Sequence, residues 1–453
     1  MSGIEQYFGE GFDCACGRHH RTAFSNFELS HGAIGKLPQI LKKLGFSKPY
    51  LLSDTHTYEA AGRQTEAALE AAGIPFVTHV LKSPETGNLT PDETAFGSAA
   101  LGLAMDVSCD IVVSVGSGTI NDTGRLLSFL TGREFILVMT APSMDGLVSG
   151  VAPLIYNDLK TTFPAHAPLA LIADLDVLVK APDIMIAAGA GDIIGKYNCL
   201  NDWKLSRIIN DEYYCETIAG IMGEAVKRTS DSVAGLAAHE EGAIRNLTEA
   251  LVFSGIAMDF SGNSRPASGA EHHMAHYWEM QSLFEKRHAN LHGTEVGIGA
   301  VIALSVYQVL AEMEKPDFEA LKRGAYDRMP YEAWEKEIRR CYQAGAPAVI
   351  ELEKTAKKND PEALVKRLER IEAHWEQIQA LAKSAPKPEE IDGLLTTLHG
   401  AKRPGEVGIS RDKVHDALMY AKELRNRYTV LQLMWDLGKL PEIADLMTDR
   451  YCS

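Results

Sequence analysis

DIVVSVGSGTIND, residues 110–122, is an apolar run followed by two glycines and then by residues that suit a helix. This order predicts a buried strand, a tight turn and a helix that begins near Asn121 and Asp122. Four more apolar runs lie around it: PYLLSD (49–54), FVTHVL (76–81), EFILVMTAPS (134–143) and ALIADLDVLV (170–179). Amphipathic stretches at 59–73 and 92–106 separate the earlier runs. Strands that alternate with helices predict βαβ units and a parallel sheet covered on both faces.

The hydrophobic pattern of the sequence changes near residue 183, after which strand-like runs disappear. We therefore predict an α/β dinucleotide-binding domain with a parallel sheet over 1–182 and an all-α metal and substrate domain over 183–453. A cleft between such domains is where small ligands bind. The segment 315–403 is rich in Lys, Glu and Ala. It predicts a helical insertion in the second domain whose charges form a solvated surface.

Composition excludes several classes of function. The 453 residues carry a net charge of −16 and have a pI near 5.4, so the chain has no overall attraction to nucleic acid. The N-terminus lacks the pattern of a signal peptide, and no uninterrupted apolar run reaches the ~20 residues of a membrane helix. Seven cysteines without a repeating framework indicate a reducing compartment. We predict a cytoplasmic protein without a membrane span.

Cys14 and Cys16 are followed closely by His19 and His20, which raises the question of a metal site. A Cys-x-Cys pair lacks the spacing of a zinc knuckle, and no second cysteine pair follows. We therefore interpret this segment as a reduced N-terminal stretch packed against the body of the protein.

The glycine motif consists of Gly116, Ser117, Gly118 and Thr119. Glycines at a strand-to-helix turn let the backbone approach a pyrophosphate, and the helix N-terminus supplies N–H groups and a positive dipole. Two glycines alone are a weak signal, because many tight turns need them for the backbone only. Asp54 ends an earlier strand, where its carboxylate would either hold ribose hydroxyls or cap a helix.

Two further clusters contain hydroxyls and carboxylates. TAPSMD (140–145) ends an apolar strand, where ligands collect in open α/β sheets, although a polar turn with a helix cap fits equally well. Gly189 to Asp192 is interpreted as the opening of a helix that continues to Lys196. Asp192 and Lys196 then lie on one helical face, which by itself indicates an ordinary surface ion pair.

The strongest cluster is SRPASGAEHHMAHYWEM (264–280), followed by NLHGTEVGIG (290–299). Two imidazoles from this cluster and a carboxylate from another helix would hold a divalent cation and leave positions open for substrate oxygens. Spacing alone does not select the two histidines from His272, His276 and His292.

Together the motifs GSGTIND, TAPSMDGLVSG, GAGDIIGK, SRPASGAEHHMAH and LHGTEVGIG resemble the superfamily of glycerol dehydrogenases, iron-type alcohol dehydrogenases and dehydroquinate synthases. Within it the chain is most similar to the bacterial sn-glycerol-1-phosphate dehydrogenase family. The resemblance covers nearly the whole chain apart from 315–403. It implies a dehydroquinate synthase-like fold, NAD(H) or NADP(H), and one zinc, nickel or iron ion.

The resemblance also implies roles for particular residues. Metal ligands fall on Asp192, His272 and His292. Catalytic or substrate-facing positions fall on Asp145, Asp192, Lys196, Arg265 and His276. Cofactor positions fall on Gly116, Ser117, Gly118, Thr119, Ile120, Thr140, Ala141, Pro142, Ser143 and Ser149. Asp54, from its place at the end of a strand, and Asp122 are also predicted to bind the cofactor. Where the family usually has a lysine after the glycine motif, this chain has Arg125.

Arg265 is the residue expected to separate substrates. In dehydroquinate synthases, which this region resembles, a matching arginine meets a phosphorylated substrate, and a guanidinium suits a phosphate dianion. The alternative is that Arg265 only pairs with Glu271. The resemblance therefore implies reversible reduction of dihydroxyacetone phosphate to sn-glycerol 1-phosphate, a step of phospholipid metabolism, in a homodimer. The metal would be a Lewis acid, and His276 or a water molecule would relay the proton.

Three other functions remain open at this stage. A polyol dehydrogenase acting on unphosphorylated glycerol would need Arg265 to be structural. A dehydroquinate synthase-like lyase normally has Glu where this chain has Asp192. A sensor that binds metal and nucleotide without turnover is the third.

Overall fold

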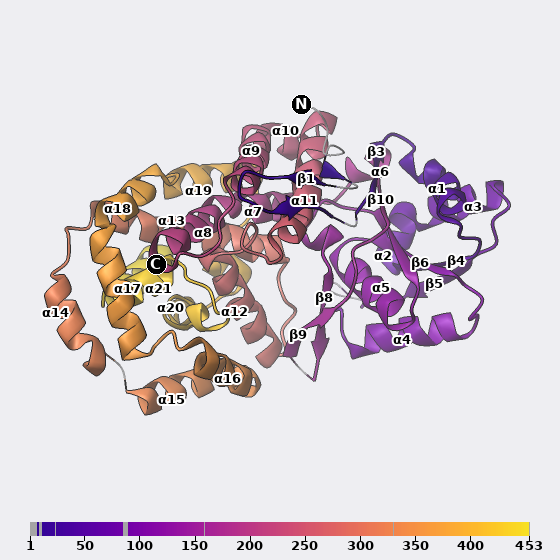
Figure 1. Ribbon diagram of the computed structural model, residues 1–453. Coiled ribbons are helices and arrows are strands. Elements are labelled where there is room, and N and C mark those ends of the chain that lie inside the picture. The colour runs from indigo at the N-terminus through magenta and orange to yellow at the C-terminus, as the bar shows by residue number, and fades with distance from the viewer. Residues whose placement is uncertain are drawn as a thin grey trace. The chain divides into compact units, whose positions relative to one another are not determined.

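The computed structural model describes residues 7–8, 11–22, 24–84, 89–157, 159–328 and 330–452, which form two compact units (Figure 1). The first unit comprises Met1–Ile193 and Lys227–Asn263, and the second comprises Ile194–Val226 and Ser264–Ser453. These units differ from the predicted segments 1–182 and 183–453. The physical reason is that α11 (Glu241–Ser261) packs against η4 (Gly146–Val148) and α6 (Leu175–Leu178), beside the sheet of the first unit.

A six-stranded parallel sheet organises the first unit, with strand order β3-β10-β7-β6-β4-β5. Its strands are β3 (Asn26–Ser30), β4 (Pro49–Asp54), β5 (Val77–Leu81), β6 (Ile111–Gly116), β7 (Glu134–Met139) and β10 (Ala170–Asp174). The five predicted strands are therefore confirmed, and β3 was missed. The run 170–179 contains a shorter strand than predicted, because the side chain of Asp174 accepts a hydrogen bond from Asp176 N and caps α6.

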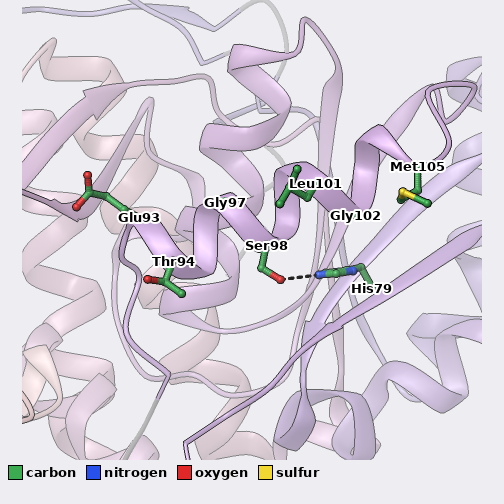
Figure 2. Close-up of a pocket in the computed structure, with 8 residues that line it drawn as sticks. All are labelled: His79, Glu93, Thr94, Gly97, Ser98, Leu101, Gly102 and Met105. Carbon is green, nitrogen blue, oxygen red and sulfur yellow. Dashed lines mark hydrogen bonds between the residues drawn. The ribbon is translucent and has the colours of Figure 1, made fainter.

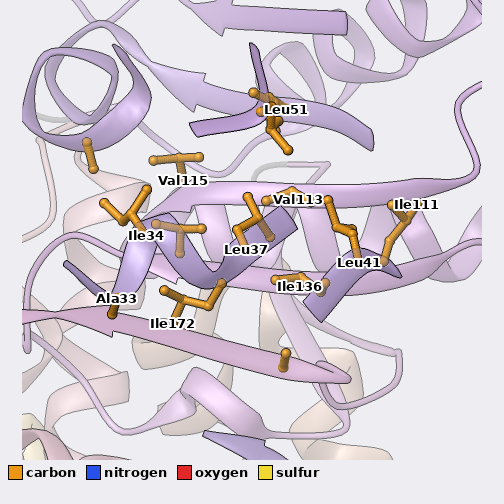
Figure 3. Close-up of a cluster of buried hydrophobic side chains, with 14 of the residues drawn as sticks. Ala33, Ile34, Leu37, Leu41, Leu51, Ile111, Val113, Val115, Ile136 and Ile172 are labelled. Atoms are coloured by element: carbon orange, nitrogen blue, oxygen red, sulfur yellow. The ribbon is translucent and has the colours of Figure 1, made fainter. Parts of the chain in front are cut away.

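Helices cover both faces of this sheet. On one face, Leu37 and Leu41 of α1 (Leu37–Leu44) pack over Ile111, Val113 and Ile136, all buried (Figure 3). On the other face, α4 (Glu93–Ala104) contacts β5, and α5 (Gly118–Leu130) contacts β6 and β7. Strands buried on both sides explain why their sequences read as continuous apolar runs. Other helices of this unit are η2 (Ala33–Lys36), α2 (Thr55–Thr57), η3 (Tyr58–Gly62), α3 (Arg63–Ala71), α7 (Asp183–Ile194) and α10 (Val233–Ala237).

Two small antiparallel hairpins complete the strands of the first unit. They are β1 (Phe12–Asp13) with β2 (His19–His20), and β8 (Val151–Tyr156) with β9 (Leu159–Pro164). After β10, the described residues form helices and no further strands, as the change in hydrophobic pattern near residue 183 predicts.

The second unit is helical. Its elements are α8 (Lys196–Asn210), α12 (Ala270–Phe284), α13 (His292–Glu312), α14 (Phe318–Arg323), α15 (Tyr331–Tyr342), α16 (Ala346–Ala356), α17 (Pro361–Ala373), α18 (Trp375–Ser384), α19 (Pro388–Thr397), α20 (Arg411–Tyr420), α21 (Val430–Asp436) and α22 (Leu440–Tyr451), with α9 (Glu216–Asp231) running from this unit into the first. The α12 and α13 helices pack together, and α13 also contacts α18, α19 and α22. Short 3-10 turns join several of them: η5 (Gly324–Asp327), η6 (Gln343–Gly345), η7 (Pro404–Val407) and η8 (Ala421–Glu423).

The α13 helix is long and apolar enough to cross a membrane by length and composition, with a mean hydropathy of 1.6 over its best window. Glu295, Ser305 and Gln308 interrupt its apolar residues, so α13 is not an uninterrupted apolar run of the kind considered in the sequence analysis. That window is 78% buried inside the structure, which is how the core helix of a helical unit behaves.

The segment 315–403 forms helices α14 to α19, so the prediction that it is helical is confirmed. The prediction that its charges form a solvated surface is only partly right. Lys358 is buried and lies 3.3 Å from a carboxylate oxygen of Glu423, in an ionic cluster inside the second unit. Apolar side chains of the segment, such as Leu368 and Ile378, are also fully buried, so these helices contribute to the core.

Candidate active site

The carboxyl ends of β6 and β7 bring two of the predicted clusters together within the first unit. Thr140 N–H donates to the carbonyl of Gly116 at 3.1 Å. The Ser117 hydroxyl donates to the carbonyl of Ala141 at 3.2 Å and lies 2.5 Å from the Ser143 hydroxyl. Neighbouring parallel strands end at the same edge of a sheet, so the glycine motif and TAPSMD form one polar surface there.

Glycine occupies the two positions of the motif for different structural reasons. A Cβ at Gly116 would lie 2.5 Å from Cβ of Ile120, so close packing of the turn requires glycine at this position. A Cβ at Gly118 would meet nothing nearer than Cε of Met144 at 3.7 Å. Since α5 begins at Gly118 and not near Asn121, the second glycine is the first residue of the helix. Its small size leaves the backbone of the first turn open to a ligand.

Ser117 is the N-cap residue of α5 but makes no capping hydrogen bond with its side chain. Its hydroxyl is directed to the neighbouring loop instead. Backbone N–H groups in the first turn of a helix have no partner within the helix, and together with the helix dipole they attract anions. The turn therefore has the chemistry of a phosphate site.

Arg125, the departure from the family's usual lysine, holds the loop that follows TAPSMD. The guanidinium is fully buried and donates to the carbonyls of Gly146, Leu147 and Val151 at 2.8, 2.5 and 2.8 Å. It also donates to the hydroxyl of Ser149 at 2.7 Å. Arg125 thus fixes the backbone around a predicted cofactor residue.

Asp122 lies beneath this surface in α5 and is buried. Burial raises the pKa of its carboxyl to about 7, and the charge of Arg125, 3.7 Å away, acts in the opposite direction. A carboxyl with this pKa is partly protonated at neutral pH. Its carboxyl group lies beside Arg125 and accepts a hydrogen bond from the side-chain amide of Asn121, so its contacts are structural contacts within α5.

Asp145 and Asp192 are linked inside the first unit. The backbone N–H of Asp145 donates to Oδ2 of Asp192 at 3.0 Å, and the hydroxyl of Ser254 donates to Oδ2 of Asp145 at 2.8 Å. Both aspartates are buried. A Cβ at Gly189 would lie 1.9 Å from the carbonyl oxygen of Pro142, so α7 packs directly on the TAPSMD loop. This contact places Asp192 beside the substrate-facing position predicted at Asp145.

The prediction that Gly189 opens a helix is wrong, because α7 begins at Asp183 and ends at Ile194. Lys196 is the first residue of the next helix, α8, so it does not share a helix with Asp192. Both side chains are fully buried, which also excludes the surface ion pair that spacing suggested.

Three histidines gather in the second unit. The ring centroids of His272 and His292 are 5.2 Å apart, those of His276 and His292 are 5.2 Å apart, and those of His272 and His276 are 6.1 Å apart. His272 and His276 come from α12, and His292 is the first residue of α13. The close packing of α12 on α13 therefore brings His292 to the two histidines of α12, which precede it by 20 and 16 residues.

Each histidine is oriented by a carboxylate. Nδ1 of His272 lies 2.8 Å from Glu271, and Glu279 receives Nδ1 of both His276 and His292 at 2.9 and 2.8 Å. Donation from Nδ1–H to a carboxylate leaves the lone pair on Nε2, which is the usual arrangement of metal-binding histidines. Glu271 and Glu279 are buried, so these pairs are well shielded from water. The donor set and its supporting carboxylates fit a divalent cation.

Glu271 is itself supported by a buried acidic network. It accepts from Gly269 N at 2.8 Å and from the side chain of Asn198. Asp202 accepts from Ala270 N and from Tyr307 at 2.7 Å each. Burial, followed by the nearby charge of Glu271, raises the pKa of Asp202 to about 7. Sequence reasoning considered Glu271 only as a partner of Arg265 and missed Glu279 and Asp202, although Glu271 and Glu279 both stand within the EHHMAHYWE motif.

Arg265 has a partner that sequence reasoning did not consider. Its Nε and Nη2 donate to the two carboxylate oxygens of Glu212 at 2.8 and 2.5 Å, and Nη1 donates to the carbonyl of Tyr428 at 2.9 Å. The side chain is buried. The suggested pairing with Glu271 is therefore replaced by a bidentate pair with Glu212, and a structural role for Arg265 has direct support.

Asp54 adopts the capping arrangement that was the alternative to ribose binding. Its Oδ1 accepts from the backbone N–H groups of His56 and Thr57 at 2.8 Å each, and Thr57 completes a capping box at the start of α2.

Figure 2 shows the residues that line a hollow along α4, where Nε2 of His79 lies 3.1 Å from the hydroxyl of Ser98. This hollow lies on the edge strand β5 and contains none of the predicted site residues.

Comparison with known proteins identifies the fold. Residues 28–182 match the family of iron-containing alcohol dehydrogenases. The structure resembles an alcohol dehydrogenase from an archaeal halo-thermophile of a Red Sea brine pool, with a TM-score of 0.61, 16% identity, and coverage of 95% of this chain and 98% of the other. It also resembles glycerol dehydrogenase from Schizosaccharomyces pombe, with a TM-score of 0.58, 14% identity, and coverage of 98% and 94%. These likenesses establish the fold, which is that of the iron-type alcohol dehydrogenases.

The sequence relatives define the family more narrowly. The chain is 33% identical to the glycerol-1-phosphate dehydrogenase [NAD(P)+] of Halalkalibacterium halodurans over 92% of this chain and 94% of the relative. Identity to the enzyme of the same name from Geobacillus stearothermophilus is 33% over 96% and 98%. The chain therefore belongs to the glycerol-1-phosphate dehydrogenase family, whose members are NAD(P)-linked oxidoreductases of the metal-dependent alcohol dehydrogenase type. The predicted family, fold class and enzyme class are confirmed.

Proposed function

We propose that this chain interconverts dihydroxyacetone phosphate and sn-glycerol 1-phosphate with NAD(H) or NADP(H) and one divalent cation. The observation that supports the proposal most is the pair His272 and His292, each held through Nδ1 by a buried glutamate. Relatives that share almost the full length of the chain are named for this activity.

The proposed metal ligands are Asp192, His272 and His292. The assignment of the two histidines is supported by the buried carboxylates that orient their imidazole rings. The assignment of Asp192 is supported by sequence resemblance. Mixed oxygen and nitrogen donors suit zinc, nickel or iron. An Asp192→Asn variant is expected to lose metal and turnover together, and full activity in that variant would remove Asp192 from the ligand set.

A bound nicotinamide would supply the hydride chemistry, and a cation held by the proposed ligands would supply Lewis acidity. His276 is proposed to hold the proton that this oxygen gains or loses. Its Nδ1 faces Glu279, so the exchangeable proton belongs to Nε2. Asp145, fixed by Ser254, is proposed to orient a substrate hydroxyl.

The substrate phosphate is proposed to bind an arginine cluster made of Arg265, Arg425 and Arg427. Burial and then the charges of Arg265 and Arg425 lower the pKa of Arg427 to about 10, so these cations are close enough to repel one another. Glu212 compensates Arg265. Within the described ranges, neither Arg425 nor Arg427 forms an ion pair, which leaves a net positive charge for a dianion. Arg427, which sequence reasoning missed, donates to the Ser264 hydroxyl at 2.7 Å and is the proposed direct contact beside Arg265.

The dinucleotide is proposed to bind at the ends of β6 and β7. The first turn of α5 would receive the pyrophosphate, and Thr140 to Ser143 with Ser149 would line the remainder. Asp54 would meet the ribose through Oδ2, because Oδ1 is occupied by the helix cap. Such a contact disfavours a 2′-phosphate and therefore favours NADH.

The test is NADH oxidation by the metal-loaded protein with dihydroxyacetone phosphate and dihydroxyacetone at equal concentrations. We expect the phosphorylated ketone to be preferred by about 100-fold or more in kcat/KM, because a dianion pairs strongly with guanidinium groups. An Arg427→Gln variant should lose most of that preference. Equal use of both ketones would favour a polyol dehydrogenase, and no turnover of either would favour a lyase.

We also propose that the protein is a cytoplasmic homodimer. All seven cysteines are present as thiols, which supports a reducing compartment. Light scattering after size-exclusion chromatography measures the mass of the assembly, and the mass of a single chain would exclude the dimer.

A further inference from the structure

The N-terminal hairpin of the first unit gathers Cys14, Cys16 and His20 in one place. The strands β1 and β2 pair with Phe12 opposite His20 and Asp13 opposite His19. Cys14 N–H donates to the carbonyl of Arg18 at 3.0 Å, and Gly17 N–H donates to the carbonyl of Cys14 at 2.9 Å. A three-residue hairpin loop of this kind needs a left-handed residue at its end, and Gly17 supplies it with φ +83°.

The loop brings three metal-binding atoms together. Sγ of Cys16 lies 3.3 Å from Nε2 of His20, and Sγ of Cys14 lies within 4.8 Å of both. A tetrahedral zinc ion separates a sulfur and an imidazole nitrogen by about 3.6 Å, and two sulfurs by about 3.8 Å. The group therefore needs only side-chain adjustments of an ångström or less to surround a zinc ion.

His20 is prepared as a ligand by its surroundings. Its Nδ1 donates to the carbonyl of Phe260 in α11 at 3.0 Å, so the lone pair is on Nε2, which faces the sulfur of Cys16. The side chain is 1% exposed. The rings of Phe12 and Phe260 lie 5.4 and 5.6 Å from the imidazole and shield it with apolar side chains.

The adjacent His19 offers a matched comparison. It projects from the other face of the same strand, is exposed, and pairs with Asp13 at 2.9 Å. One histidine of the HH pair therefore has the burial and second partner of a metal ligand, and the other has the properties of a surface residue.

We propose that Cys14, Cys16 and His20 bind a structural zinc ion that cross-links the N-terminal hairpin and holds His20 in place for its hydrogen bond to α11. Both cysteines would bind as thiolates and release their protons, and a fourth position would be taken by another side chain or by water. This site has sulfur donors, unlike the proposed catalytic site, whose donors are oxygen and nitrogen. It does not depend on the proposed function.

The first test is zinc-edge X-ray absorption of the wild-type protein, which requires no variant. We expect a shell of sulfur scatterers at about 2.3 Å, which the catalytic donors cannot produce. Metal analysis should give about two zinc ions per chain after zinc loading. Absence of the sulfur shell would overturn the proposal, and so would a Cys14–Cys16 disulfide, detected as a mass lower by two hydrogens.

The second test compares variants. His20→Asn and Cys16→Ser should each lose one zinc ion per chain and the sulfur shell, whereas His19→Asn should keep both. Asp192→Asn should lose the other metal and keep the sulfur shell, so failure of the proposed activity is distinguishable from failure of this site. Single serine variants of Cys109, Cys199, Cys215, Cys341 and Cys452 identify a fourth sulfur ligand if one exists. Retention of both zinc ions by His20→Asn would contradict the assignment.

Discussion

Glu279 orients two histidines at once, because its two carboxylate oxygens receive Nδ1 of His276 and of His292. One of these rings is a proposed metal ligand and the other a proposed proton carrier. A single buried carboxylate would thus link the proposed metal ligand to the proposed proton carrier. Glu271 serves His272 alone and is held by its own network.

We expect Glu279→Gln to weaken metal binding by about 10- to 100-fold, the usual effect of losing a carboxylate behind a ligand histidine. The amide oxygen still accepts one hydrogen bond, but its charge is lost and it cannot serve both rings equally. Competition with a chromogenic chelator measures the affinity. Glu285→Gln, just beyond the end of the same helix and paired with Arg287 at the surface, is the control and should bind metal like the wild type. Equal affinity in both variants would contradict the assignment.

Arg265 and Glu212 form a second test at this scale. Burial raises the pKa of Glu212, but the hydrogen bonds and charge of Arg265 more than offset this, so its net pKa lies below the ordinary value. A lowered carboxyl pKa stabilises the fold above the unfolded pKa, and this stability is lost as the pH falls through the folded pKa. Arg265→Ala should therefore cost about 2 kcal/mol at neutral pH, and less as the pH falls below the ordinary glutamate pKa of 4.5.

The urea midpoint of Arg265→Ala, Glu212→Gln and the double variant measures this pair. A bidentate pair predicts that the double variant loses clearly less stability than the sum of the single variants. Additive losses would mean that the two side chains do not interact. The same variants assayed for phosphorylated ketone preference separate the structural role of Arg265 from its proposed role in phosphate binding.

At the scale of elements, the parallel strands could be predicted because burial on both faces makes them apolar throughout, as in PYLLSD. The β8–β9 hairpin could not, because β9 has no buried residue and both strands contain proline. The start of α7 was misjudged because Gly189 suggested a boundary, although it is a contact point inside the helix. The histidines could be predicted from local spacing. Their partner carboxylates and Glu212 depend on side-chain directions and on long-range packing, which a single sequence does not reveal.

Gly189→Ala tests the contact of α7 with the TAPSMD loop. The new methyl group would lie 1.9 Å from the carbonyl oxygen of Pro142, so the helix or the loop must move. We expect a loss of about 2 kcal/mol or more of stability, together with weaker NADH binding. Gly220→Ala in α9 is the control, because nothing lies within 4 Å of its Cβ position, and it should stabilise the protein by about 0.5–1 kcal/mol. Thermal unfolding measures both, and similar effects would contradict the packing.

Glu423 in η8 pairs with Lys358 of the segment 315–403 and with its own neighbour Lys422. Burial alone would raise its pKa, but the two lysines lower the pKa to about 2. The stabilisation is therefore present above the ordinary glutamate pKa and is lost as the pH falls from about 4.5 to about 2. We expect Glu423→Gln to cost about 3 kcal/mol at pH 7.

Urea unfolding at pH 7 and pH 3.5 checks this expectation. The difference in stability between wild type and Glu423→Gln should shrink at the lower pH, because the wild-type carboxylate is then losing its advantage. Glu351→Gln, whose exposed carboxylate pairs with Lys354 at the surface, should change stability by less than about 0.5 kcal/mol at either pH. An unchanged difference would mean that Glu423 is not the acid-sensitive group.

For the whole molecule, the glycine motif belongs to the first unit and the three histidines belong to the second. Turnover needs both, but binding of dinucleotide and binding of metal rest on different residues, so each should be removable without the other. Gly118→Ala fits the fold, since its Cβ would lie 3.7 Å from the nearest atom, yet it fills the space through which a pyrophosphate approaches. We expect this variant to unfold at the wild-type temperature, to keep its metal, and to bind NADH about tenfold more weakly or worse, a change of about 1.4 kcal/mol.

Removing the metal should have the complementary effect. Chelator treatment of the wild type, or His272→Ala, should abolish turnover, while the NADH dissociation constant measured by fluorescence stays within about twofold, or about 0.4 kcal/mol. If loss of metal also abolished NADH binding, the two functions would share a site, and the assignment of the dinucleotide to the ends of β6 and β7 would fail.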